Sequence, residues 1–211
     1  MIEHVVLYRF KPETEPSQIA ATINGLNGLV SINEVVHLSA GPLLRAHSSS
    51  SSLSFTHMLH CRYNSQDDLK AYAVHPAHVS LVNRTSVLLD DIMAVDWIWE
   101  DASAPAPGSV SKVVFLKLKD NLAHKEYVLE VIRETCNKFS SICQFSFGEN
   151  FSLNRAKGFS IAILMVFDGV EVLDSSAEIM NLLNEKLKDL VEDDLVLDCI
   201  IGTPQSDSSS T

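Results

Sequence analysis

Apolar and polar residues alternate in several short segments of the chain, and this period of two predicts β-strands. In residues 2–10, one face of the predicted strand would carry Ile2, His4, Val6, Tyr8 and Phe10. Three later segments of the first half have a similar pattern and predict further strands, at residues 33–42, 53–63 and 91–99. Gly41 and Pro42 are expected to end the second of these strands, because both residues commonly interrupt regular structure.

Apolar residues three or four positions apart predict helices between these strands. The first helix is expected at residues 17–29 with Ser17 as its N-cap, and the second at residues 65–74 with Ser65 as its N-cap. A further helical segment is expected to begin at Pro76, since proline suits the first position of a helix, and to run to about residue 89.

The second half of the chain repeats this order of signals. Strands are predicted at residues 110–119, 142–151, 158–167 and 194–202, and helices at residues 124–139 and 176–191. The ends of the two halves align directly, with VLLDDIMAVDWI (87–98) matching DLVEDDLVLDCI (189–200). The chain therefore contains an internal repeat of about 100 residues whose two members have diverged.

The order β-α-β-β-α-β in each half predicts an α+β fold of two tandem ferredoxin-like units. Such a unit places both helices on one face of an antiparallel sheet and leaves the other face uncovered. The predicted strands are largely apolar, so the uncovered face requires a partner sheet. Sheet-on-sheet packing would form an α+β barrel of the dimeric type, either between the two halves of one chain or between two chains in a homodimer.

Composition sets the expected domain boundaries. We expect a first barrel domain at residues 1–100, a linker at 101–111 and a second, diverged barrel domain at 112–203. The linker is indicated by Pro105, Pro107 and Gly108 among small residues. Serine-rich residues 48–52 predict a mobile loop, and the polar residues 204–211 predict a disordered tail.

Charge and hydropathy exclude several kinds of partner. The net charge is −11 and there is no basic stripe, so neither nucleic acid nor an anionic membrane surface is an expected partner. No apolar run is long enough to predict a membrane-spanning helix. The four cysteines form no metal-type spacing, which favours reduced, mostly buried thiols and a cytoplasmic location.

Histidines concentrate in the first half of the chain, which carries seven of the eight. Two of them, His75 and His78, lie in the segment AYAVHPAHVSL (71–81). A metal clamp is one interpretation, but Pro76 at the first helical position would leave His75 outside the helix. A zinc site would also need a further ligand, for which only His4 or His57 is available.

An acid–base site is a second interpretation of the same segment. Tyr72 and His78 flank a break between two helices, and His4 and His57 alternate with apolar residues on predicted strands. If these faces meet, a histidine base and a tyrosine hydroxyl would line an apolar pocket suited to proton transfer on a carbonyl compound. The alternative is that these side chains only satisfy buried backbone groups.

The segments IEHVVLYRFK, FTHMLHCRYNS and AYAVHPAHVSLV together resemble the stress-response A/B barrel family, and the whole chain resembles its tandem two-domain plant members. The resemblance implies a protein that binds a small apolar ligand without established catalysis. It leaves two other functions open, an antimicrobial defence protein and a polyketide cyclase-like lyase that closes a linear polyketide by an intramolecular aldol step. It also allows a peroxisomal location, for which the C-terminus carries no signal.

The resemblance to the cyclase group implies roles for particular residues. Tyr72 and His78 match its catalytic pair, and His4 and His57 match its additional pocket histidines, with His75 beside them. The second half departs from this pattern: its aligned positions hold Asp174, Ala177, Met180, Lys112 and Ile161. The second domain is therefore expected to be a structural partner that supplies a sheet.

A cation site is a further implication of the resemblance. Some relatives hold a cation on backbone carbonyls at the end of the first helix, where the helix dipole is negative. The matching carbonyls would be those of Asn27, Val30, Ser31 and Asn33, and the ion would be Mg²⁺ or another cation. The alternative is a helix end capped only by water. No other cofactor is expected.

Overall fold

Each half of the chain folds as the predicted β-α-β-β-α-β unit. The computed structural model describes residues 1–48, 53–100, 103–119, 124–174 and 176–202. The first unit contains β1 (Ile2–Phe10), α1 (Pro16–Gly28), β2 (Val35–Ser48), β3 (His57–Tyr63), α2 (Gln66–Val74), α3 (Pro76–Thr85) and β4 (Leu89–Ile98). The second unit contains β5 (Val110–Leu118), α4 (Lys125–Cys136), β6 (Gln144–Glu149), β7 (Ile161–Phe167), α5 (Val170–Asp174), α6 (Ala177–Leu187) and β8 (Val191–Ile200). Three 3₁₀ turns complete the described elements: η1 (Leu29–Ser31), η2 (Ser86–Leu88) and η3 (Leu153–Arg155).

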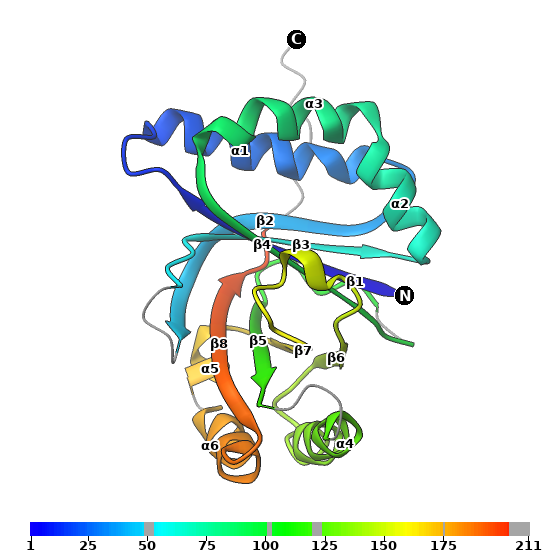
Figure 1. Ribbon diagram of the computed structural model, residues 1–211, viewed down its shortest axis with the longest axis vertical. Helices are drawn as coiled ribbons and strands as arrows, with labels where there is room; N and C mark the ends of the chain where they lie inside the picture. Colours follow the sequence, from blue (N-terminus) through cyan, green and yellow to red (C-terminus); the bar gives the residue numbers. More distant parts are fainter. Residues whose placement is uncertain (49–52, 101–102, 120–123, 175, 203–211) are drawn as a thin grey trace.

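The eight strands form one antiparallel sheet in the order β4-β1-β3-β2-β8-β5-β7-β6. Helices α1, α2 and α3 cover the outer face of the first unit's strands, and α4 and α6 cover the outer face of the second unit's strands (Figure 1). The inner faces pack against each other, so the predicted α+β barrel forms within one chain.

The barrel interior is a core to which both units contribute. Side chains at alternate positions of the strands meet there, including Val5, Leu7, Met93, Trp97, Val113, Phe115, Leu164 and Leu197. All of these are almost completely shielded from solvent. The uncovered sheet face that each unit would have alone is thus buried by the other unit, as the sequence predicted.

The edge strands of the sheet, β4 and β6, come together on the other side of the barrel from the β2–β8 junction. Their contact is of a different kind, because β2 and β8 are joined by a ladder of strand hydrogen bonds. The backbone N–H of Phe151 donates to the carbonyl of Asp96 at 3.0 Å, and the N–H of Asp96 donates to the side-chain oxygen of Asn150 at 3.1 Å. A Cβ at Gly148 would lie 3.2 Å from the Ile98 carbonyl oxygen and the Trp97 side chain, a tight contact, so glycine favours the close approach of the two edges. The barrel is therefore closed here by a few hydrogen bonds between β4 and the loop that follows β6, and not by a ladder between two strands.

The predicted end of the second strand at Gly41 and Pro42 is wrong. Strand β2 continues to Ser48, and Pro42 marks a change of partner instead. Residues Val35–Pro42 pair with β3, whereas Leu43–Ser48 pair with β8 of the second unit. Because Pro42 lacks an N–H, it suits a position where one ladder ends and another begins.

Several predicted helix boundaries are confirmed and one is corrected. Ser65 caps α2 by accepting a hydrogen bond from the Asp68 N–H at 3.1 Å, and α3 begins at Pro76. Helix α1 begins at Pro16 with Glu15, not Ser17, at the N-cap, because Glu15 and Gln18 form a reciprocal capping box. Strand β5 begins at Val110, within the range expected for the linker. Residues 49–52, 101–102 and 204–211 of the predicted loop, linker and tail lie outside the described residues.

A buried charged network links the units inside the barrel. The Glu3 carboxylate accepts hydrogen bonds from Arg62 at 3.0 Å and from Ser146 of the second unit at 2.9 Å, and it lies 2.6 Å from the His60 ring nitrogen. Arg62 also donates to the Ser103 carbonyl. Burial would raise the pKa of Glu3, but His60 and Arg62 outweigh it and lower the pKa to about 2.

We predict that this network makes the fold sensitive to acid. The pKa of Glu3 is lower in the folded than in the unfolded chain, so its contribution is complete above about pH 4.5 and is lost as the pH falls towards 2. Over that interval the free energy of unfolding should fall by about 1.4 kcal/mol per pH unit through this group.

Urea denaturation at a series of pH values measures this slope. The double variant Glu3→Gln, Arg62→Met removes both charges together and should reduce the slope by about one proton. The exposed carboxylate variant Glu192→Gln serves as the control and should leave the slope unchanged. Equal slopes in the wild type and the double variant would contradict the assignment.

Candidate functional site

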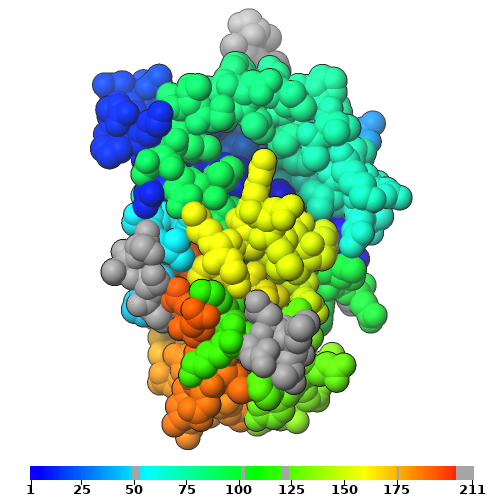
Figure 2. Space-filling model, viewed as in Figure 1, coloured from blue at the N-terminus to red at the C-terminus, as the bar shows by residue number. Residues whose placement is uncertain are grey.

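A cavity of about 690 Å³ lies between the sheet and the helices of the first unit. Its lining is mainly apolar, with Val6, Leu26, Leu59, Leu69, Val79 and Val82 among the contributing residues. In the space-filling view, a hollow separates the green and teal helical segment of the first unit from the yellow segment that follows β6 (Figure 2). A volume of this size is typical of small-molecule sites.

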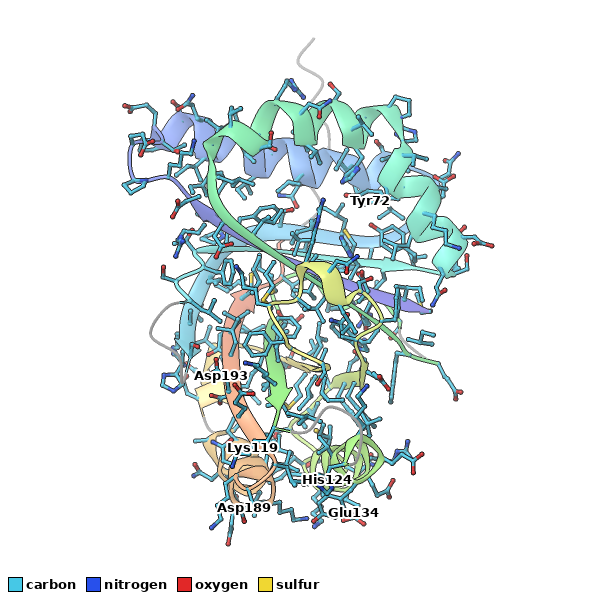
Figure 3. The ribbon with its side chains drawn as sticks, viewed as in Figure 1. Tyr72, Lys119, His124, Glu134, Asp189 and Asp193 are labelled. Carbon is cyan, nitrogen blue, oxygen red and sulfur yellow. The ribbon has the colours of Figure 1, made fainter. Side chains whose placement is uncertain are left out.

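Three of the predicted site residues line this cavity: Tyr72, His78 and His4. Tyr72 lies on the buried side of α2, between the helices and the sheet (Figure 3). The rings of Tyr72 and His78 lie 4.5 Å apart between centroids. The break between α2 and α3 brings these two side chains together, because Pro76 starts a new helix directly after the His75 cap.

The hydrogen bonding of His78 defines which of its ring nitrogens is free to act as a base. Its Nδ1 lies 3.0 Å from the Ala73 carbonyl oxygen, which can only accept, so Nδ1 carries the proton. Nε2 then holds the free lone pair. Burial is the main cause that lowers the pKa of His78 below its ordinary value of 6.5, the Ala73 bond opposes this shift, and the charges of His4 and Arg155 add to it. His78 is therefore largely neutral at pH 7.

Tyr72 is almost completely buried, at 1% exposure, and its hydroxyl is one of the buried groups without a hydrogen-bond partner among the described residues. The hydroxyl of Tyr63 is another, but the two phenols lie close together, and a hydrogen bond between them is among the influences on both of their pKa values. Burial raises the pKa of Tyr72 above its ordinary value, so the hydroxyl stays protonated and can act as a donor. A bound acceptor would give the Tyr72 hydroxyl a further hydrogen-bond partner.

His4 lies on the sheet face below the helices and is paired through Nδ1 with Asp96 of β4. Burial would raise the pKa of Asp96, but the charge and hydrogen bond of His4 hold it below its usual range. The pair fixes the orientation of the His4 ring within the cavity wall.

The structure does not bring the other two predicted histidines into the cavity lining. His57 shares a sheet face with His4 but lies opposite Tyr8, with its ring against Phe10 and its Nδ1 on the Thr56 hydroxyl. His75 caps α3, where its Nδ1 accepts a hydrogen bond from the Ala77 N–H at 3.2 Å. These placements follow from strand register and from the proline that starts α3.

One cavity residue was not anticipated from the sequence. Arg155 belongs to η3 of the second unit, yet it lines the cavity of the first. Sequence patterns carry no signal for such a contact, because it depends on how the two units pack.

The same place in the second unit is largely filled. A cavity of about 220 Å³ remains there, lined by residues that include Met180, Leu183 and Leu187 of α6. In the register of β4 and β8, Met180 occupies the position of His78 and Leu187 that of Thr85. Asp174, at the position of Tyr72, forms an ion pair with Arg45.

The predicted cation site offers little to a metal ion. The side chain of Asn27 is committed to Ile23 and Ala40, its backbone carbonyl accepts from the Leu29 N–H, and the neighbouring Gly28 carbonyl accepts from Ser31. Val30 could add its backbone oxygen and Asn33 its backbone and amide oxygens, and none of the four residues supplies a charge. Among the described residues, no group of three or more His, Cys, Asp or Glu side chains is arranged to hold a metal. A site built from backbone carbonyls therefore stays a prediction, and no chemistry is assigned to a cation.

The fold and the cavity together define a tandem α+β barrel protein, with two ferredoxin-like units and a pocket in the first of them. The sequence model of the Stress responsive A/B Barrel Domain family matches the chain twice, at residues 2–99 and 110–201. The chain belongs to this family.

Two curated relatives from Arabidopsis thaliana, both described as stress-response A/B barrel domain-containing proteins, match over nearly the whole chain. The first is 41% identical over 100% of this chain and 82% of its own length. The second is 40% identical over 94% of this chain and 95% of its own length. A solved structure of a Fusobacterium nucleatum protein shares the fold, with a TM-score of 0.66 at 12% identity, covering 95% of this chain and 92% of that one.

Two other sequence-based expectations can be compared with the structure. Within the described ranges, no helix is both long and apolar enough to cross a membrane. The four cysteines are free thiols, and Cys61, Cys136 and Cys199 are buried as expected.

We predict that His75 and His78 are opposite neutral tautomers. His78 should carry its proton on Nδ1, facing the Ala73 carbonyl, whereas His75 should carry it on Nε2, because its Nδ1 accepts from Ala77. Nitrogen-15 NMR of histidine-labelled protein separates the two tautomers, and a pH titration should place the pKa of His78 below 6.5. A His78 proton on Nε2 would remove the basis for its role as a base towards the cavity.

Proposed function

We propose that the first unit binds a small apolar ligand in the cavity between its sheet and helices. The observation that carries this proposal is the large difference between equivalent places in the two units, about 690 Å³ in the first and 220 Å³ in the second. The second unit shows that the fold can fill this space with α6 side chains. An apolar hollow left unfilled forfeits packing energy, which a ligand would supply.

The polar groups of the cavity are suited to orient such a ligand. Tyr72 presents a protonated hydroxyl and His78 presents a free ring nitrogen, so a carbonyl or hydroxyl group on the ligand could be held at the helix break. A location in the cytoplasm, where a mainly apolar metabolite needs a carrier or an enzyme, is part of the same proposal.

A cavity-filling substitution tests ligand binding. Ala94 lies on the cavity wall, whereas Ala77 is exposed on α3 and does not line the cavity. Ala94→Phe should weaken binding of the neutral fluorescent probe N-phenyl-1-naphthylamine by about tenfold or more, because the added ring occupies its space. Ala77→Phe adds the same ring outside and should leave probe affinity unchanged. Equal probe affinities in the two variants, or no binding to the wild type, would refute the proposal.

A second candidate function is acid–base catalysis of the polyketide cyclase type, favoured by the pairing of His78 with Tyr72. In such a reaction, Nε2 of His78 takes a proton from a carbon next to a carbonyl, and the Tyr72 hydroxyl stabilises the oxyanion that forms. The carbanion then attacks a second carbonyl of the same chain, and the new alkoxide receives the proton held by His78. All atoms and electrons balance without a cofactor.

Turnover of linear tetraketide and pentaketide thioesters tests this candidate. His78→Ala should lower the rate of cyclised product by about 10²–10⁴-fold, the usual contribution of a general base, and Tyr72→Phe should lower it as well. His47→Ala and Tyr127→Phe are matched controls, since both side chains are exposed and neither lines the cavity. Activity should fall only below pH 6.5, as His78 becomes protonated. Identical product patterns with and without the protein would eliminate the cyclase candidate.

A further inference from the structure

The cavity of the first unit has a cationic residue that belongs to the second unit. The segment after β6 crosses to the first unit, and η3 places Arg155 among the cavity residues. In the space-filling view, the yellow segment of the second unit borders the hollow beneath the first unit's helices (Figure 2). The cavity is therefore completed by both halves of the chain.

The segment that carries Arg155 is held at both ends. Asn150 and Phe151 bond to Asp96 of β4, and Lys157 forms an ion pair with Asp91 at 2.8 Å. Ala156 and Phe159 are buried in the barrel core. Arg155 thus stands on a fixed segment, although its own side chain is exposed.

The other charged side chains around the cavity form ion pairs, whereas Arg155 pairs with no residue in the described part of the chain. Asp90 pairs with Arg9 at 2.8 Å, and Asp91 pairs with Lys157. His4 pairs with Asp96. Among the described residues, Arg155 has neither an ion pair nor a hydrogen bond, and its charge reaches the cavity interior, where it disfavours the protonation of His78.

An anionic ligand is unexpected for the protein as a whole, which has a net charge of −11. A local cation is needed to offset that repulsion, and a guanidinium suits a carboxylate because it can donate two parallel hydrogen bonds. The remaining lining is apolar, which fits a hydrocarbon chain.

We propose that Arg155 makes the cavity selective for apolar carboxylates, with the carboxylate at the η3 rim and the hydrocarbon chain under α2 and α3. This inference rests on the proposed ligand-binding function and adds the chemical class of the ligand and a specificity-determining residue from the second unit.

Calorimetric titration of the full chain with octanoate and with 1-octanol tests the selectivity. The wild type should bind octanoate about three- to tenfold more tightly than 1-octanol, as expected for one partly exposed ion pair, and added salt should reduce the preference. Arg155→Gln should weaken octanoate binding to the level of 1-octanol without changing the affinity for 1-octanol. Arg155→Lys should retain part of the preference.

Arg84→Gln is the matched control, because Arg84 is exposed on α3 and does not line the cavity. It removes the same charge from the protein and should leave the preference intact. If Arg155→Gln keeps the preference, or the wild type shows none while binding both compounds, the carboxylate inference is overturned and the ligand-binding proposal stands. If the wild type binds neither compound, both fail.

Discussion

The whole structure depends on one constraint: the inner sheet face of each unit is apolar and cannot stay in water. Each unit buries the apolar face of the other, because the two faces pack together into one barrel core. This packing requires β2 to run past Pro42 and pair with β8, and it brings the β6–β7 segment against β4. It also buries Glu3, Arg62 and His60, whose mutual hydrogen bonds make a charged group tolerable inside an apolar core. The same packing places Arg155 of the second unit in the wall of the first unit's cavity.

Most of the local structure could be predicted from the sequence because local rules control it. Alternation identified the strands, and Ser65 and Pro76 marked helix starts by their own chemistry. The failures came where a distant partner decides the outcome. Gly41 and Pro42 look like the end of a strand until the second unit offers β8 as a new neighbour. At α1 the error was local, since the capping box between Glu15 and Gln18 outweighed the nearby Ser17.

The part of the candidate site that comes from the first unit alone could be predicted from the sequence. Strand parity placed His4 beneath the helices, and the break at Pro76 placed Tyr72 beside His78. The alternation of residues along β3 correctly predicted that His57 shares a sheet face with His4. The pairing register of β1 and β3, however, sets His57 opposite Tyr8, away from the cavity lining. Arg155 had no sequence signal, because it lies about 80 residues from this segment and joins the cavity only through the packing of the units.

Comparison of the two units separates what the fold needs from what the cavity needs. Asp96 and Asp198 occupy the same strand position, and each has a basic partner, His4 in the first unit and Lys112 in the second at 2.6 Å. A carboxylate with a basic partner at this position therefore belongs to the architecture. The pair of Tyr72 and His78 does not, since Asp174 and Met180 replace it in a unit with the same fold. Met180 and Leu187 close the space that His78 and Thr85 leave open. The first unit gives up that apolar packing, and this cost points to a ligand rather than to stability.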